Sequence, residues 1–225
     1  MNLFYQPRLK EGITSLDGDE AHHAKVLRLS FGDEILVTDG RGLMIKARVN
    51  NKDSFTILEQ TTNPRSYSIH LFVAPTKNSD RMEWLVEKAT EIGVDSITLV
   101  ECKRSERKKI NRDRLVKMAI SAMKQSQQSW LPEVKELTSF DDVIKLKHDQ
   151  KFIAFVDHAN PDQLKNLAVP NKSYGLLIGP EGDFTDEEIQ LALNNNWKKV
   201  SLGPTRLRTE TAALAGCLTL VLANN

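Results

Sequence analysis

The chain has 225 residues, of which 40% are hydrophobic and 27% are charged, and its formal net charge is +1 at pH 7. This composition is typical of a globular protein with one large or two small domains, and no apolar run approaches the roughly 20 residues that span a bilayer. The small net charge excludes a global electrostatic field that would attract nucleic acid. The N-terminal residues lack the basic and apolar regions of a secretory signal, so we expect a cytoplasmic protein without a membrane partner.

Short strands separated by turns are predicted for residues 1 to about 62. Ile35 to Thr38 and Leu43 to Val49 flank Asp39-Gly40-Arg41-Gly42, which is typical of a hairpin turn because glycine adopts positive φ readily. Asp53 to Leu58 is predicted to be a further strand. The pattern indicates a small β-barrel.

The polar stretch from Gln60 to Ser66 is typical of a linker and predicts domains at residues 1–65 and 66–225. Beyond it, Ile69 to Ala74 is predicted to be a buried strand. A helix follows, with Asp80 expected as its cap, Glu83 as the partner in a capping box, and Gly93 as its terminator.

Strands and helices continue to alternate toward the C-terminus. Thr185 and Glu188 predict a capping box at the start of one further helix, and Asn111 to about Gln128 predicts another. The remaining predicted strands are Ile97 to Val100, Phe152 to Val156, Gly175 to Ile178 and Val200 to Leu202. The alternation predicts an α/β domain with a largely parallel sheet, in which ligands bind outside the carboxyl ends of the strands.

Cysteine and charge patterns add two local expectations. Cys102 and Cys217 have no partners at metal-ligand spacing, so we expect reduced thiols and no metal. The segment from Lys103 to Lys117 is strongly basic, which fits either a phosphate-contact patch or a solvated loop and helix start.

Two Gly-Pro loops follow the last two predicted strands. The first is Gly179-Pro180-Glu181-Gly182, and the second runs from Gly203 through Glu210 into a helix of small residues. Neither a G-x-G-x-x-G fingerprint nor a P-loop is present, so a dinucleotide dehydrogenase or P-loop NTPase is not predicted. Glycine lets the backbone approach a ligand and proline stiffens the turn, which suits an adenine ring and ribose; two ordinary strand-ending turns would show the same residues.

The two loops together resemble the cofactor end of the SPOUT class of RNA methyltransferases. Three further segments narrow the resemblance: His22 to Arg28, Lys77 to Gly93, and Gln125-Ser126 followed by Leu131-Pro132. With them the chain resembles the ribosomal RNA small-subunit methyltransferase E family, which methylates N3 of one uridine in 16S rRNA.

The resemblance implies an α/β fold with a C-terminal SPOUT-type domain, a mostly parallel sheet and a trefoil knot, plus a small N-terminal PUA-like β-barrel. It also implies a homodimer that acts on 16S rRNA or the small ribosomal subunit and binds S-adenosyl-L-methionine. The residues that it implies for the cofactor are Phe155, Val156, Ile178, Gly179, Pro180, Gly182, Leu202, Gly203, Leu207, Arg208, Thr209, Thr211 and Ala212. The candidate RNA-binding residues are His22, His23, Lys25, Arg28, Arg41, Lys77, Arg81, Lys103, Arg104 and Arg107. A polar barrel surface would explain the four residues from His22 to Arg28 equally well.

Three departures from the family pattern bear on these expectations. Asp183 stands where the family usually has a second glycine, and Gln127 and Gln128 stand where an arginine is usual. An arginine common near the family's N-terminus is also absent, since Asn2 and Leu3 precede Phe4. We expect the departures to bear on RNA contacts and not to touch the cofactor loops.

Methylation of uridine N3 first requires loss of the N3 proton, which places negative charge on O2, N3 and O4. We expect Arg208 to stabilise this anion because its guanidinium stays charged and can donate to a carbonyl oxygen. A salt bridge to Glu210 or to a partner subunit is the alternative role. Glu210 could accept the N3 proton or orient Arg208. His158 is a second candidate base, and Glu181 is expected to fix its loop.

Two other functions fit the same residues. The first is another SPOUT specificity, such as ribose 2′-O-methylation, which needs a base for a hydroxyl. The second is a non-catalytic RNA-binding module that has kept the fold.

Overall fold

The computed structural model describes residues 1–51, 53–106, 110–156 and 162–225. Arg107 and His158 therefore lie outside the described residues. The described chain forms two compact units. The first contains Met1–Arg65 and Ile120–Leu131, and the second contains Ser66–Ala119 and Pro132–Asn225.

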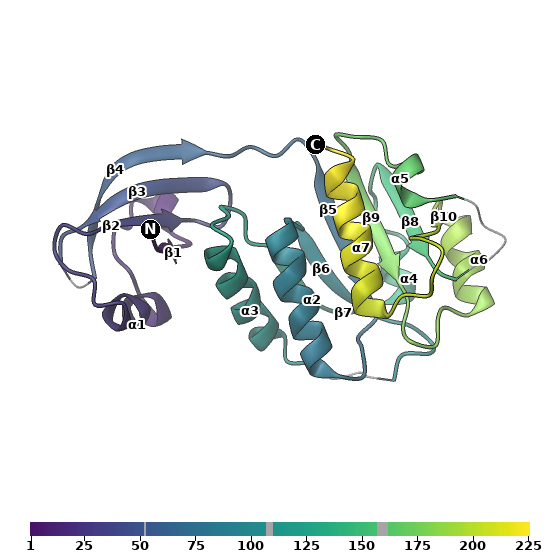
Figure 1. Cartoon of the computed structure of the whole chain (residues 1–225). Helices are drawn as coiled ribbons and strands as arrows, with labels where there is room; N and C mark the ends of the chain where they lie inside the picture. The colour runs from purple at the N-terminus through teal and green to yellow at the C-terminus, as the bar shows by residue number, and fades with distance from the viewer. Residues whose placement is uncertain (52, 107–109, 157–161) are drawn as a thin grey trace. The chain divides into compact units, whose positions relative to one another are not determined.

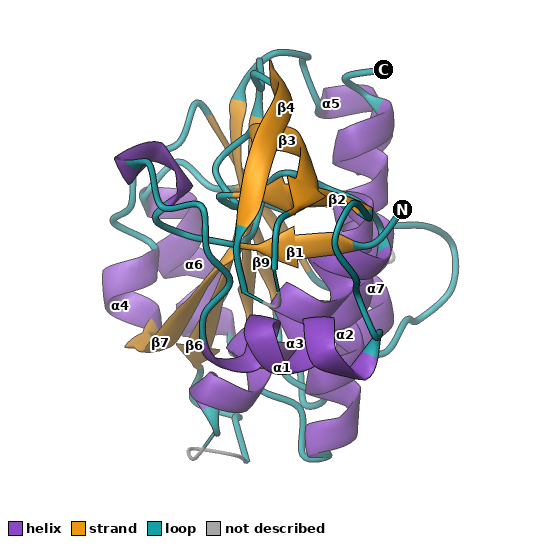
Figure 2. Cartoon of the chain, turned by 90° about the vertical axis from the view of Figure 1, so that its left-hand side faces the viewer, coloured by secondary structure: helices purple, strands orange, loops and turns teal. Residues whose placement is uncertain are grey.

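The first unit is built on a four-stranded sheet in the order β1-β2-β3-β4 (Figures 1 and 2). Its strands are β1 (Leu3–Tyr5), β2 (Glu34–Thr38), β3 (Leu43–Val49) and β4 (Phe55–Thr62). β1 runs parallel to β2, and the other neighbours are antiparallel. In β3, buried side chains alternate with more exposed ones, and Ile35 and Ile45 lie in the core of the unit.

Helix α1 (Gly18–Val26) corrects the expectation that this region contains only strands and turns. The only buried residues of α1 are Glu20 and Ala24, so its sequence has no apolar stripe to mark a helix. The Glu20 carboxylate accepts hydrogen bonds from the Tyr5 backbone N–H at 3.1 Å and from Lys124 Nζ at 2.6 Å. A buried acid, together with the small apolar contacts of Ala21 and Ala24, thus attaches α1 to the unit.

The second unit contains a six-stranded parallel sheet in the order β10-β8-β9-β5-β6-β7. Its strands are β5 (Ser68–Val73), β6 (Ser96–Glu101), β7 (Glu133–Ser139), β8 (Gln150–Ala154), β9 (Ser173–Ile178) and β10 (Lys198–Val200). Its longer helices are α2 (Ser79–Ile92), α6 (Asp186–Asn194) and α7 (Thr209–Leu222), with the short α4 (Phe140–Val143) and α5 (Leu164–Leu167). Helix α3 (Arg112–Gln125) begins in the second unit and ends in the first.

Helices cover both faces of this sheet. On one face, Phe140 of α4 and Ala192 of α6 share a core cluster with Leu177 of β9. On the other face, α7 packs beside α2 (Figure 1). A Cβ at Gly216 of α7 would lie only 2.3 Å from the Leu176 side chain. The small residue at this position of α7 is therefore explained by close packing on the sheet.

The predicted helix ends are confirmed in part. Thr185 and Glu188 form the expected capping box of α6, and Gly93 ends α2 with a φ of 106°. The expectation that Asp80 caps α2 is wrong, because the cap is Asn78, whose side chain accepts a hydrogen bond from the Asp80 N–H. Asp80 is acidic and lies in the first turn, where it favours the helix dipole.

Both cysteines are buried as free thiols. Burial raises the pKa of Cys102 to about 12, so this thiol stays protonated at neutral pH. Within the described ranges, no helix has the length and apolar character needed to cross a membrane. The same residues include no cluster of three or more His, Cys, Asp or Glu side chains that could hold a metal ion.

Candidate cofactor pocket

The carboxyl ends of three neighbouring strands open into one cavity of the second unit. β8 ends at Ala154, β9 at Ile178 and β10 at Val200, and all three residues line the cavity. Its volume is about 690 Å³, within the range of small-molecule sites. The N-terminus of α7 closes the site through Thr209 and Ala212. The parallel sheet thus places its ligand site where such sheets usually carry one.

Most residues implied for the cofactor meet in this cavity. They are Phe155, Val156, Ile178, Gly179, Pro180, Leu202, Gly203, Leu207, Arg208, Thr209 and Ala212. Gly182 and Thr211 do not line it: the Gly182 carbonyl accepts a hydrogen bond from Arg104, and Thr211 is exposed on α7. Glu181, Pro204, Thr205 and Arg206 also line the cavity and belong to the two Gly-Pro loops assigned to the cofactor. The lining residues that the sequence did not indicate for a cofactor are Arg81, Ala154, Gln163, Asp183, Val200 and Ser201. Ala154, Val200 and Ser201 lie within strands predicted from the sequence, which was the available signal.

Hydrogen bonds from three other segments fix the loop from Gly179 to Phe184. The Thr209 hydroxyl donates to the Gly179 carbonyl at 3.0 Å, and Arg206 donates to the Glu181 carbonyl at 3.2 Å. Arg104 donates to the carbonyls of Gly182 and Phe184. The Glu181 carboxylate accepts the backbone N–H of Lys77 at 3.1 Å. The loop is therefore held in shape without a ligand, as a preorganised site requires.

Asp183 accounts structurally for its departure from the family pattern. Its φ is 61°, a left-handed conformation that glycine adopts easily and that aspartate tolerates better than most residues. Its carboxylate accepts the N–H of Phe184 at 2.8 Å and the N–H of Val156 at 3.3 Å. The side chain thus joins the loop after β9 to the segment after β8, a connection that a glycine cannot make.

Five charged residues are among those that line the cavity. Arg81, Arg206 and Arg208 line it together with Glu181 and Asp183. Arg208 is exposed and, within the described part of the chain, its side chain makes no ion pair or hydrogen bond with the protein. It occupies the N-cap of α7, where a cation opposes the helix dipole. An anionic ligand at this position would offset that cost.

Glu210 is paired with a different arginine from the one expected. Its Oε1 lies 3.6 Å from Nε of Arg81, and its side chain is only 8% exposed. Oε2 is buried without a hydrogen-bond partner. Glu210 itself does not line the cavity, but Arg81 does. The pair therefore links the start of α2 to the start of α7 and places a guanidinium at the cavity wall.

The candidate RNA-binding residues differ in whether their side chains are exposed or paired with acids. In the second unit, Lys77 Nζ lies 2.9 Å from Glu106 and Lys103 Nζ lies 3.7 Å from Glu187, so both are paired with acids. In the first unit, His22, Lys25 and Arg28 are exposed at or just after α1. His23 is half-buried, with its ring centroid 5.4 Å from that of Phe4.

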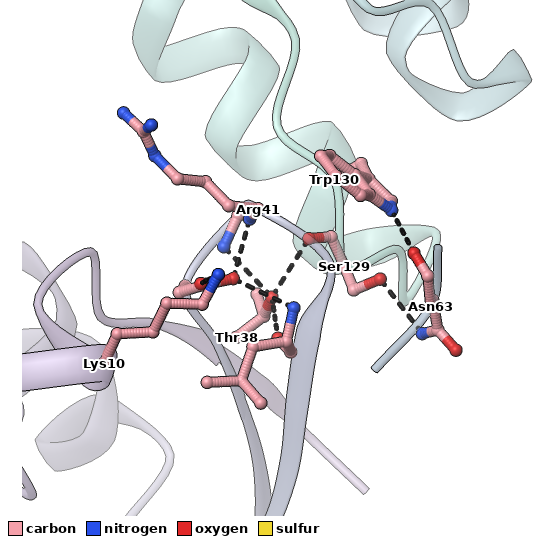
Figure 3. Close-up of polar contacts among 9 residues, drawn as sticks. Lys10, Thr38, Arg41, Asn63, Ser129 and Trp130 are labelled. Atoms are coloured by element: carbon pink, nitrogen blue, oxygen red, sulfur yellow. Dashed lines mark hydrogen bonds and ion pairs between the residues drawn. The ribbon is translucent and has the colours of Figure 1, made fainter. Parts of the chain in front are cut away.

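Arg41 is held on a rigid loop of the first unit. The buried Asp39 carboxylate accepts the backbone N–H of Arg41 at 2.7 Å and is paired with Lys10 at 3.2 Å. The Thr38 hydroxyl donates to the Leu43 carbonyl. Figure 3 shows this network, with the Arg41 side chain extending away from the other labelled residues. A Cβ at Gly42 would lie 2.6 Å from the Trp130 ring, so this tight packing requires glycine.

Two family models match the chain. An RNA methyltransferase domain matches residues 63–221, and an RNA methyltransferase PUA domain matches residues 16–60. Together they account for the two kinds of region that the sequence predicted.

Similar proteins agree with these matches. The ribosomal RNA small subunit methyltransferase E of Bacillus subtilis is 28% identical over 220 residues, covering 89% of this chain and 86% of the relative. The structure of a probable rRNA-methyltransferase from Porphyromonas gingivalis is 36% identical, covers 100% of this chain and 98% of its own, and has a TM-score of 0.90. A ribosomal RNA small subunit methyltransferase E from Neisseria gonorrhoeae, solved bound to S-adenosyl methionine, is 28% identical with a TM-score of 0.84 and covers 96% and 95% of the two chains. The chain therefore belongs to the ribosomal RNA small-subunit methyltransferase E family of RNA methyltransferases and carries that family's PUA domain.

Proposed function

We propose that the protein uses S-adenosyl-L-methionine to methylate N3 of a specific uridine in 16S rRNA of the small ribosomal subunit. The observation that carries the proposal is the cavity at the carboxyl ends of β8, β9 and β10, which both Gly-Pro loops line. The family membership and the relative solved with S-adenosyl methionine support the same cofactor and an rRNA substrate.

The residues of the cavity suit this cofactor. Phe155, Ile178 and Leu202 offer apolar surface to an adenine ring, and the fixed loop after β9 exposes backbone groups for its polar edges. The carboxylates of Glu181 and Asp183 favour a ligand with cationic groups. Bound there, S-adenosyl-L-methionine would supply a methyl group activated by a positively charged sulfur.

Arg208 is the residue that we assign to the chemical step. Uridine N3 would lose its proton to water, which places negative charge on N3, O2 and O4. The N3 lone pair would then take the methyl group while the bond between that carbon and the cofactor sulfur breaks, and S-adenosyl-L-homocysteine would leave as a neutral thioether. The unpaired guanidinium of Arg208 at the cavity can donate hydrogen bonds to one of these oxygens. Correct placement of N3 beside the methyl group supplies much of the remaining acceleration.

We assign Glu210 to holding Arg81 in place. Its carboxylate is buried, and it reaches the cavity only through the guanidinium of Arg81. This assignment separates the two arginines: Arg81 shapes the wall, and Arg208 faces the substrate.

The resemblance also supports a trefoil knot, a cytoplasmic location and a homodimer as parts of this proposal. Leu218 and Leu222 of α7 and Trp84 of α2 are exposed by 45%, 64% and 44%, and a second copy would cover apolar side chains of this kind. The RNA contacts implied for His22, His23, Lys25, Arg28, Arg41, Lys77, Arg81, Lys103, Arg104 and Arg107 remain predictions.

Nucleoside analysis of rRNA from a strain that lacks the gene tests the proposal. We expect 3-methyluridine to disappear from 16S rRNA and to return when the wild-type gene is supplied. Persistence of 3-methyluridine, or loss of a ribose-methylated nucleoside instead, would contradict it. Calorimetry with S-adenosyl-L-methionine separates the enzyme from a non-catalytic RNA-binding module, because no binding at millimolar ligand would exclude the enzyme.

A further inference from the structure

An aromatic side chain stands on a rigid turn of the first unit. Phe31 is 82% exposed. The turn is closed by a hydrogen bond from the Asp33 N–H to the Ser30 carbonyl at 3.2 Å, and the Asp33 carboxylate accepts the Ser30 N–H at 2.8 Å. Gly32, with a φ of 92°, donates its N–H to the Val49 carbonyl of β3 at 2.9 Å. The turn is therefore fixed to the sheet with the Phe31 ring in solvent.

Packing does not explain this ring. Leu29, two residues earlier, packs against the core of the first unit, whereas Phe31 points away from it. Val26 and Leu27 at the end of α1 are also exposed, by 65% and 38%. Residues 26–31 thus include three exposed apolar side chains that do not pack in the core.

Arg28 lies between them in a costly backbone conformation. Its φ is 54°, and it follows α1 at the position where helices usually have glycine. Hydrogen bonds from the Leu29 N–H to the Ala24 carbonyl and from the Arg28 N–H to the Lys25 carbonyl hold this geometry. A side chain at positive φ costs free energy that glycine would not, so a role for the guanidinium would account for the arginine.

The segment that carries the ring has two cations, Lys25 and Arg28, and one acid, Asp33, whose carboxylate faces the Ser30 N–H. Across the described ranges, the side chains of Lys25 and Arg28 have no ion pair or hydrogen-bond partner. The acids nearby are engaged: Asp33 with the Ser30 N–H, and Glu20 with Lys124 and the Tyr5 N–H. An anionic partner with a flat apolar group matches such a surface better than an apolar or basic one.

We propose that Phe31, Arg28 and Lys25 form a binding site for an unpaired RNA nucleotide. The base stacks on the Phe31 ring beside Leu27, and the flanking phosphates pair with Arg28 and Lys25. The choice of RNA as partner rests on the proposed function. The inference goes beyond it by predicting that the first unit recognises an unpaired base rather than only the phosphates of a duplex.

The test uses the purified full-length protein and two RNAs of equal length, a single-stranded oligouridine and a perfectly paired duplex. Phe31→Ala is expected to weaken binding of the single strand by about tenfold and to change duplex binding little, because stacking needs an unpaired base. Arg28→Gly is expected to weaken binding of both RNAs and to lower the salt dependence, while the protein becomes no less stable to urea.

Asn196→Gly is the matched control for the arginine. Asn196 also lies at positive φ, 65°, at the same position after a helix, and the Trp197 N–H bonds back to the Ala192 carbonyl as the Leu29 N–H does to that of Ala24. This change should relieve similar strain and leave RNA binding unchanged. Ile57→Ala, which removes an exposed apolar side chain of β4, is the control for Phe31.

The proposal would be overturned if both Phe31→Ala and Arg28→Gly bound RNA with wild-type affinity. The discovery of a protein partner for this surface would not change that conclusion. Nucleoside analysis of cells that carry the same variants keeps the two proposals apart. If the wild type forms 3-methyluridine and the variants bind RNA normally, only this inference fails. If the variants lose single-strand binding and the wild type forms no 3-methyluridine, only the proposed function fails.

Discussion

At the carboxyl ends of β8 and β9, charged side chains line a cavity of about 690 Å³. Near the amino ends of strands in the same sheet, by contrast, His70 and His148 each lie beside a serine hydroxyl. His70 Nδ1 lies 2.8 Å from the Ser96 hydroxyl, and His148 Nδ1 lies 3.0 Å from that of Ser173. The two imidazole rings stack with centroids 4.6 Å apart. Within the described residues, one end therefore has an arginine without a protein partner beside the cavity, and the other end packs two imidazole rings against each other.

This difference shows how one sheet serves both function and stability. Charges left unpaired near a cavity cost stability unless a ligand compensates them. The rings at the opposite end accept or donate a hydrogen bond at Nδ1 and carry no buried charge at neutral pH. Substitutions at the two ends should accordingly change different measurements.

The largest effect is expected from Arg208→Ala. We expect kcat to fall by about 10²- to 10³-fold, because the anion on the uracil oxygens loses its cationic donor. The affinity for S-adenosyl-L-methionine should change by less than about twofold, since this guanidinium faces the substrate. Methyl transfer to small subunits and calorimetry measure the two quantities. An equal loss of both would assign Arg208 to cofactor binding.

Asp183→Gly tests whether the loops at the cavity are preorganised. Glycine suits the φ of 61°, but it removes the hydrogen bonds to the N–H groups of Phe184 and Val156. We expect the cofactor to bind about tenfold more weakly, with little change in urea stability. Asn196→Gly, at a φ of 65° just after α6, is the control and should leave cofactor binding unchanged. Unchanged binding in Asp183→Gly would show that the loops need no such connection.

His148→Phe tests the opposite end of the sheet. Burial lowers the pKa of His148 from 6.5 to about 4, so between these values the unfolded chain binds a proton that the folded chain does not. The contribution of neutral His148 to the free energy of unfolding should be fully present above pH 6.5 and should be lost as the pH falls toward 4. The loss should be on the order of 1 kcal/mol, because the ring is only partly buried and solvent screens the effect.

Urea unfolding of the wild type and His148→Phe between pH 4 and 7.5 measures this dependence. The phenylalanine variant should lose less stability in acid than the wild type, and the exposed His22→Ala variant should lose as much. A wild-type curve that is flat between pH 6.5 and 4 would contradict the account of the histidine pair.

The smallest effect on catalysis is expected from Glu210→Gln. The amide keeps the shape and can still accept a hydrogen bond from Arg81, so kcat should fall only about threefold. Because the buried carboxylate has one oxygen without a hydrogen-bond partner, its replacement should not destabilise the fold. A loss of kcat as large as that of Arg208→Ala would instead make Glu210 the proton acceptor.

Elements with a strong apolar pattern could be predicted from the sequence. β3 lies at Leu43–Val49 as predicted, and the Gly-Pro loops indicated most of the cavity because they follow buried strands. Helix α1 was missed because its core-facing residues are the acid Glu20 and the small Ala21 and Ala24, which do not form a recognisable apolar stripe.

Other features depend on contacts between segments that are distant in the sequence. The pairing of Arg81 with Glu210 and the bond from Asp183 to Val156 require the fold before they exist. The same holds for Ile120–Leu131, which packs with the first unit through contacts such as Trp130 against Gly42. Local propensity contains no information about such pairs.

The most direct test of the central claim is one labelling reaction. Purified protein is incubated with methyl-labelled S-adenosyl-L-methionine and small ribosomal subunits from the strain that lacks the gene, and the 16S rRNA is then digested to nucleosides. The account predicts label in 3-methyluridine with the wild type and none with Arg208→Ala. Label in a ribose-methylated nucleoside, or in no nucleoside with the wild type, would contradict it.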